Sequence, residues 1–199
     1  VLDTDARILS LKPKVLDDIW SDVQNVADQL SVSEKGRVFC EEEESRVKAV
    51  QTRRGNGNAP KVLTIEWIEP IYIGGMWLPE MIEIAGGQVC IAESGQPAPV
   101  VNREELAKIE PDVIVVKPCG YKLDQTLKEL DLLKQQIPEW KKPPRVYLVD
   151  GNSYFNRPGP RILDSLEILA YCIHPELFAD FGERYKQGII ELGPDLQLP

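Results

Sequence analysis

The chain has 199 residues, of which 43% are hydrophobic and 28% charged, as expected for a globular protein with one sizeable core. Its net charge of −9 repels phosphate backbones, so we expect no nucleic-acid partner. No apolar run approaches the roughly 18–20 residues of a membrane span, and residues 1–5 lack the basic start and apolar core of a signal peptide.

Two helices are predicted first. Apolar residues recur three or four positions apart between Leu11 and Leu30, and Ser10 can cap this helix. The second helix is expected from Glu34 to Arg54. Its apolar stripe is thin and residues 41–44 are all acidic, which favours a solvated outer element over a binding surface. A flexible turn at residues 55–58 ends this helical segment.

From residue 62 onward, apolar strands alternate with helices. The strands are expected at residues 62–65, 113–116 and 146–149, with a short one near 89–91. The helices are expected at residues 78–85, after Asn102, at 124–136 and from 162 to about 172, and residues 178–198 carry only weak signals. Asn102 and Glu105 have the capping-box spacing. The alternation predicts an α/β fold with a mainly parallel central sheet flanked by helices.

Each strand is followed by a loop that carries aromatic residues. Parallel strands share an orientation, so these loops should emerge at one edge of the sheet, where open α/β folds bind ligands. The aromatic residues concerned are Trp67, Tyr72, Trp77, Tyr121, Tyr154 and Phe155. With Arg157 beside them, they would suit a flat ligand with an acidic or amide rim. The alternative is that the aromatic side chains of the third loop fill the helix–sheet interface.

Sites for metals or catalysis are not indicated. The four cysteines, at positions 40, 90, 119 and 172, stand apart, and His174 is the only histidine, which argues against a zinc site. We expect Cys90, Cys119 and Cys172 to be buried free thiols, although the spacing leaves disulfides open. No GxSxG motif or phosphate loop occurs. The acids Glu66, Glu69 and Glu80 are interpreted as loop and helix-start residues, so we expect no enzyme.

Three motifs together resemble a known family. They are TIEWIEPIYIGGMWLPEMIEIAGG (residues 64–87), EPDVIVVKPCGY (110–121) and VDGNSYFNRPGPRILDSLEILA (149–170). In this order they are similar to the cobalamin-binding members of the helical-backbone substrate-binding proteins of ABC importers. That family has two α/β lobes joined by a long helix, with a corrinoid held between the lobes.

The resemblance implies roles for individual residues. The ligand-facing positions of the family fall on Trp67, Tyr72, Trp77, Pro118, Tyr121, Tyr154, Phe155 and Arg157. Arg157 would donate to a propionamide carbonyl or a phosphate, unless it forms a structural ion pair. Glu104 resembles the acidic residue that docks such a lobe onto a permease, unless it serves only the first turn of its helix. Ala98 stands where one family member has a tryptophan, which predicts a shallower pocket or another corrinoid.

The resemblance also implies a domain division. Residues 1–4 resemble the last strand of a first lobe, residues 1–58 the connecting helical segment, and residues 59–199 the C-terminal lobe. We expect corrinoid as a non-covalent ligand, with a siderophore or heme, or a ligand-free assembly role, as alternatives. An extracytoplasmic location is implied, with the cytoplasm as the alternative because no signal peptide is visible. Without a first lobe, the stripe of the Leu11–Leu30 helix and the aromatic edge would lie open, which predicts a homodimer with the aromatic edge or this helix in its interface.

Overall fold

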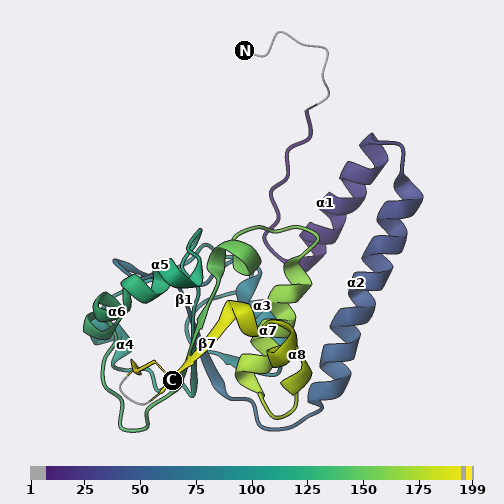
Figure 1. The fold of residues 1–199 in the computed structure, drawn as a ribbon. Coiled ribbons are helices and arrows are strands. Elements are labelled where there is room, and N and C mark those ends of the chain that lie inside the picture. Colours follow the sequence, from purple (N-terminus) through teal and green to yellow (C-terminus); the bar gives the residue numbers. More distant parts are fainter. Residues whose placement is uncertain (1–7, 194–195, 199) are drawn as a thin grey trace.

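The structure is a computed structural model, and it describes residues 8–193 and 196–198. A seven-stranded sheet lies at its centre, in the order β4-β2-β1-β5-β6-β7 with β3 paired to β1 (Figure 1). The strands are β1 (Lys61–Trp67), β2 (Ile71–Ile73), β3 (Gln88–Val89), β4 (Val100–Val101), β5 (Val113–Val116), β6 (Arg145–Val149) and β7 (Ile189–Leu192). The strand end expected at residues 1–4 lies outside the described residues.

The middle of the sheet is parallel. Strand β5 pairs in parallel with both β1 and β6, so that Val62, Val113 and Arg145 lie in one row across the sheet. This confirms the predicted α/β fold. Strands β2, β4 and β7 extend the sheet through antiparallel pairs, β2 with β1, β4 with β2 and β7 with β6. The sequence did not predict these additions, because strands of two to four residues carry little periodic signal.

Helices cover both faces of the sheet. The helices are α1 (Leu16–Gln29), α2 (Ser33–Arg54), α3 (Leu78–Ile84), α4 (Arg103–Leu106), α5 (Leu123–Lys128), α6 (Leu130–Gln136), α7 (Ile162–Ile173) and α8 (Ala179–Arg184), with a π-helical turn η1 (Gly151–Phe155) and a 3₁₀ turn η2 (Lys186–Gly188). Strand β5 serves both faces because its side chains alternate. Val113 and Val115 join the core under α3 and α7, whereas Ile114 and Val116 join the core on the side of α4 and α6.

Helix α1 begins five residues later than predicted. The carboxylate of Asp18 accepts the amides of Lys14 and Val15, and Glu80 of α3 accepts the amide of Leu16 at 2.9 Å. These acceptors satisfy amide groups at the start of the helix and place its first turn against α3. The Asp18 contact lies within the N-terminal segment, but the Glu80 contact joins residues 64 positions apart, which no local pattern reveals.

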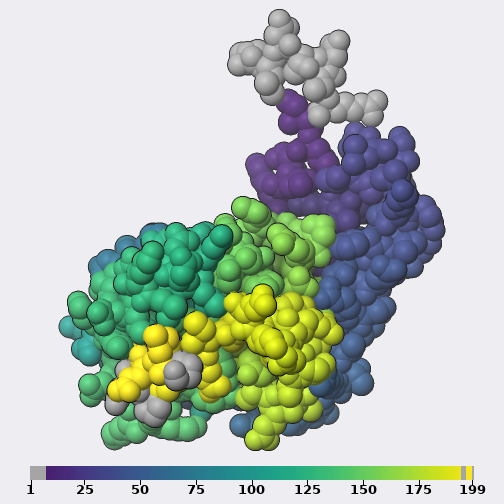
Figure 2. Space-filling view, viewed as in Figure 1, coloured from purple at the N-terminus to yellow at the C-terminus, as the bar shows by residue number. Residues whose placement is uncertain are grey.

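The apolar stripe between Leu11 and Leu30 is covered only in part. Ile19 is buried with Leu16 and Trp20 in the core that α2, α3 and α7 share, so the stripe does not lie open along its whole length. At its start, Leu11 is exposed. Exposed apolar side chains remain at its far end, where Leu30 is 67% exposed. Figure 2 shows this end of the α1–α2 pair standing clear of the rest of the chain.

Helix α2 is the solvated element that its sequence predicts, but it is held to the sheet domain by ion pairs. Arg46 donates to Glu167 of α7 at 2.9 Å and to Asp164 at 3.1 Å. Its Nη1 donates to Glu43, which is 7% exposed, and burial raises the pKa of that carboxyl. The Arg46 contacts hold α2 against α7, and these two helices are in contact.

Two further expectations need correction. The helix predicted over residues 124–136 is interrupted at Glu129, which separates α5 from α6. All four cysteines are free thiols, and Cys172 is buried as expected, but Cys90 is half-buried and Cys119 is exposed in the loop after β5. The loop turns away from the core after Pro118. Cys119 is therefore exposed although it follows an apolar strand in the sequence.

Candidate functional site at the carboxyl edge of the sheet

The loops that follow β1, β5 and β6 meet at one edge of the sheet, as the parallel pairing requires. The loop after β5 is also hydrogen-bonded to the end of β1 and to the segment after β6. The amide of Cys119 donates to the carbonyl oxygen of Glu66, and the amide of Asn152 donates to that of Tyr121, both at 2.9 Å. Gly151 permits the third loop to approach, because a Cβ there would lie 2.2 Å from the carbonyl oxygen of Pro118. The three loops therefore form one connected surface.

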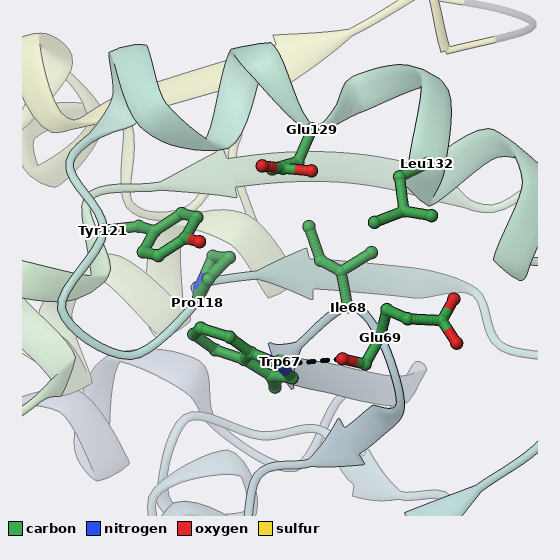
Figure 3. A pocket seen from close by; sticks show the side chains of 7 residues that line it. All are labelled: Trp67, Ile68, Glu69, Pro118, Tyr121, Glu129 and Leu132. Atoms are coloured by element: carbon green, nitrogen blue, oxygen red, sulfur yellow. Dashed lines mark hydrogen bonds between the residues drawn. The ribbon is translucent and has the colours of Figure 1, made fainter.

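Trp67 and Tyr121 form the aromatic centre of this surface. Their ring centroids are 5.3 Å apart with the rings inclined at 72°, which is the edge-to-face arrangement that aromatic pairs favour. The indole nitrogen of Trp67 donates to the carbonyl oxygen of Glu69 at 2.9 Å, and this bond orients the ring (Figure 3). Trp67 keeps 36% of its area exposed, so it can still contact a ligand.

A small cavity of about 80 Å³ lies between these rings and α5–α6 (Figure 3). It is lined by Trp67, Ile68, Glu69, Pro118, Tyr121, Glu129 and Leu132. Trp67, Pro118 and Tyr121 were predicted as site residues, and the structure brings these three together. Glu129 and Leu132 were missed, because nothing in their local sequence indicates that the helix breaks at Glu129.

A buried ion pair supports the floor of the site. Lys117 is 1% exposed, and its ammonium nitrogen lies 3.1 Å from a carboxylate oxygen of Glu66. The same nitrogen lies 5.7 Å from the centroid of the Phe155 ring. Since an unpaired buried ammonium is costly, Glu66 serves to neutralise Lys117 and is not free for a ligand.

The three predicted acids therefore act separately. Glu66 pairs with Lys117, Glu69 accepts from the side chain of Gln136, and Glu80 accepts the amide at the start of α1. Their partners belong to three different elements, so they do not form one catalytic cluster. Within residues 8–193 and 196–198, no group of His, Cys, Asp and Glu is arranged to hold a metal ion.

Tyr72 lies beside Trp67, whereas Trp77 lies against the core under α3 and α7. Tyr72 lies opposite Trp67 in the β1–β2 register and is 36% exposed. Trp77 precedes α3 and is half-buried against the core under α3 and α7. Its indole nitrogen is buried and has no hydrogen-bond partner in the described part of the chain. Neither residue lines the cavity between Trp67 and Tyr121.

The third loop places its aromatic residues mainly in the core. Phe155 is 3% exposed, and the half-buried Tyr154 packs edge-to-face on Tyr185 at 5.6 Å. The alternative, that this loop fills the helix–sheet interface, therefore describes both residues as they stand. Arg157 is exposed, and it has no ion-pair partner among the residues that the structure describes.

Glu104 and Ala98 lie outside the cavity. Glu104 is exposed in the first turn of α4, where Asn102 and Glu105 form the predicted capping box. Ala98 is half-buried, and its amide lies 2.5 Å from the position that a Cβ on Gly75 would occupy.

Across the described ranges, no helix is both long and apolar enough to span a membrane.

The sequence is similar to known binding proteins over most of its length. The family model described as periplasmic binding protein matches residues 4–144. A vitamin B12-binding protein of Yersinia pestis is 24% identical over 153 residues, which are 76% of this chain and 51% of that protein. The chain thus spans about half the length of the curated relatives it matches.

Solved structures share the fold. A periplasmic heme binding protein from Pseudomonas aeruginosa superposes with a TM-score of 0.67 at 19% identity, over 84% of this chain and 62% of that one. The periplasmic vitamin B12 binding protein of Vibrio cholerae superposes with a TM-score of 0.57 at 21% identity, over 87% and 65%. At these identities the likeness establishes the fold alone.

Proposed function

We propose that this chain, which belongs to the periplasmic binding protein family, forms the C-terminal lobe of a substrate-binding protein that holds a corrinoid. The observation that carries the proposal is the partly exposed Trp67–Tyr121 pair, held by hydrogen bonds between the segments at the carboxyl ends of the strands. A preorganised aromatic surface suits a wide, mostly apolar disc, because the rings lose little conformational freedom on binding.

The site residues differ in how directly they would contact the ligand. Trp67, Pro118 and Tyr121 contact the ligand directly, and Tyr72 and Trp77 widen the surface on the β2 side. Tyr154 and Phe155 support the site by packing into the core, where Phe155 is buried and Tyr154 is half-buried. Arg157 is exposed, which suits donation to a carbonyl or phosphate of the ligand.

The wider assignment rests on the family. We propose that residues 1–58 form the connecting helical segment and residues 59–199 the C-terminal lobe, and that Glu104 contacts an ABC transporter permease. The location is extracytoplasmic, as the name of the family implies. We propose that the ligand is non-covalent and that the chain acts as a binding protein.

Titration of the purified chain with cyanocobalamin, followed by the visible spectrum of the ligand, tests this function. We expect saturable binding that Trp67→Ala weakens about tenfold. Leu177→Ala is the control, because Leu177 is 39% exposed and lies outside the site. Titration with haemin examines the other ligand class, since one neighbour in fold is a heme binding protein. If neither compound binds at millimolar concentration, a ligand-free assembly role replaces the proposal.

A further inference from the structure

The cavity beside Trp67 is the size of one side arm of a ligand. A water molecule needs about 10–15 Å³ of such space, so about 80 Å³ accommodates a few non-hydrogen atoms but no macrocycle. A disc that rests on the exposed face of Trp67 would therefore insert a peripheral substituent between the rings and Glu129. The chemistry of the cavity decides which substituent fits.

The lining offers two carboxylates, of which only that of Glu129 is unengaged, and no cation. The carboxylate of Glu129 has no hydrogen bond or ion pair within the described ranges, whereas that of Glu69 is engaged by Gln136. No lysine or arginine lines the cavity. Lys117 lies in the floor of the site, but it is 1% exposed and paired with Glu66.

The lining also offers one hydroxyl. Figure 3 shows the Tyr121 hydroxyl and the Glu129 carboxylate on the side of the cavity above Pro118 and Ile68. A primary amide matches this pair, because its N–H donates to a carboxylate while its carbonyl accepts from a phenol. A carboxylate substituent would instead face the negative charge of Glu129 at short range in a partly dehydrated space, which disfavours it.

We propose that this cavity is a subsite for a neutral amide arm, and that Glu129 makes the site discriminate against ligands whose arms are carboxylates. The inference rests on the proposed function and narrows it. It favours amide-bearing corrinoids over acid-bearing tetrapyrroles, including porphyrins with propionate arms. Tyr121 thereby has two roles, as an aromatic wall and as a hydrogen-bond donor.

A matched pair of corrinoids tests the proposal. The whole chain is titrated at low ionic strength with dicyanocobinamide, whose arms are amides, and with dicyanocobyrinic acid, whose arms are carboxylates. We expect the amide compound to bind at least tenfold more tightly, a difference of about 1.4 kcal/mol. In Glu129→Gln the ratio of the two affinities, amide compound over carboxylate compound, should fall below about threefold. The carboxylate compound gains affinity when the like charge of Glu129 is removed.

Asp131→Asn is the control for general electrostatics. Asp131 lies two positions from Glu129, but it is 92% exposed and does not line the cavity. The affinity ratio should be unchanged in this variant. Equal affinities in the parent chain, or a ratio that survives Glu129→Gln, or one that falls equally in Asp131→Asn, would overturn the subsite while leaving corrinoid binding intact. Absence of binding by both compounds would overturn the proposed function itself.

Discussion

Lys117, which directly follows β5, forms an ion pair with Glu66 of the neighbouring β1, with 3.1 Å between the ammonium nitrogen and a carboxylate oxygen. The two partners are unequally exposed, since the side chain of Lys117 is 1% exposed and that of Glu66 is 22% exposed. Water can therefore solvate Glu66 alone, but it cannot solvate Lys117 alone. The pair stands directly beneath the loops that carry Trp67 and Tyr121.

This asymmetry predicts unequal effects of the two substitutions. Glu66→Gln leaves a buried ammonium without its carboxylate, and it should lower the free energy of unfolding by about 3 kcal/mol. Lys117→Met replaces the buried charge with an apolar side chain of similar length, and it should change that free energy by less than about 1 kcal/mol. Urea unfolding measures both. Equal losses in the two variants would show that packing, and not the buried charge, dominates.

The Trp67–Tyr121 contact should appear as coupling in a double-mutant cycle. Trp67→Ala and Tyr121→Ala each remove one ring from the pair, and the double variant removes both. We expect a coupling energy of about 0.5–1.5 kcal/mol in the free energy of unfolding, as is typical of aromatic pairs. Additive losses would mean that the two rings do not stabilise each other.

Arg46 should matter far more for stability than Arg37, which lies on the same helix. Arg37 pairs with Glu34 and Glu41 at exposed positions, so Arg37→Ala should change the free energy of unfolding little. Arg46→Ala removes the cation that Glu43, Asp164 and Glu167 share, and of these three only Glu167 keeps another cation, Arg184. Glu43 and Glu167 are largely buried.

We expect Arg46→Ala to cost about 3 kcal/mol, at the lower end of the range for breaking a buried ion pair, because Arg46 keeps 32% of its side chain exposed. Urea unfolding of the two variants in parallel provides the measurement. Similar losses for Arg37→Ala and Arg46→Ala would contradict the anchoring role of Arg46 between α2 and α7.

His174 predicts a pH dependence just below neutrality. Burial, together with the positive charges of Arg145 and Arg54, lowers its pKa below the usual value of 6.5, against the opposing effect of its contact with the carbonyl oxygen of Gly86. Because the unfolded chain takes up this proton more readily than the folded chain, stability is complete above about pH 6.5 and falls as pH drops from there to the folded pKa.

The test combines unfolding and titration. The free energy of unfolding should fall less steeply below pH 6.5 in His174→Gln than in the parent chain. NMR titration is unambiguous because His174 is the only histidine. A midpoint at or above 6.5 would exclude this contribution.

On the α1 side, the exposed apolar surface that could form the predicted homodimer is smaller than the whole Leu11–Leu30 stripe. The exposed apolar side chains near the end of the α1–α2 pair are Val26, Leu30, Val32 and Val38. If two copies cover these residues, sedimentation at micromolar concentration should show association, and Leu30→Lys should abolish it. A parent chain that sediments as a monomer of 22.4 kDa at all concentrations would exclude the dimer.

The sequence by itself determined the features that depend on a few neighbouring residues. The apolar run at residues 113–116 forms a strand, and Asn102 with Glu105 forms a capping box, as predicted. Strand–helix alternation was enough to predict that the loops of Trp67 and Tyr121 share an edge, because right-handed parallel crossovers leave little other choice. Three motifs in order were enough to identify the family.

Only the tertiary structure decided which residues at that edge can meet a ligand. Glu129 enters the cavity because a helix breaks where its sequence shows no breaker, and Phe155 turns into the core although it lies in an aromatic loop. Glu66 pairs with Lys117, 51 residues away in the sequence, and Arg46 pairs with Glu167, 121 residues away. Such contacts depend on the packing of distant elements, whereas periodicity and capping signals extend over only a few turns or a single strand.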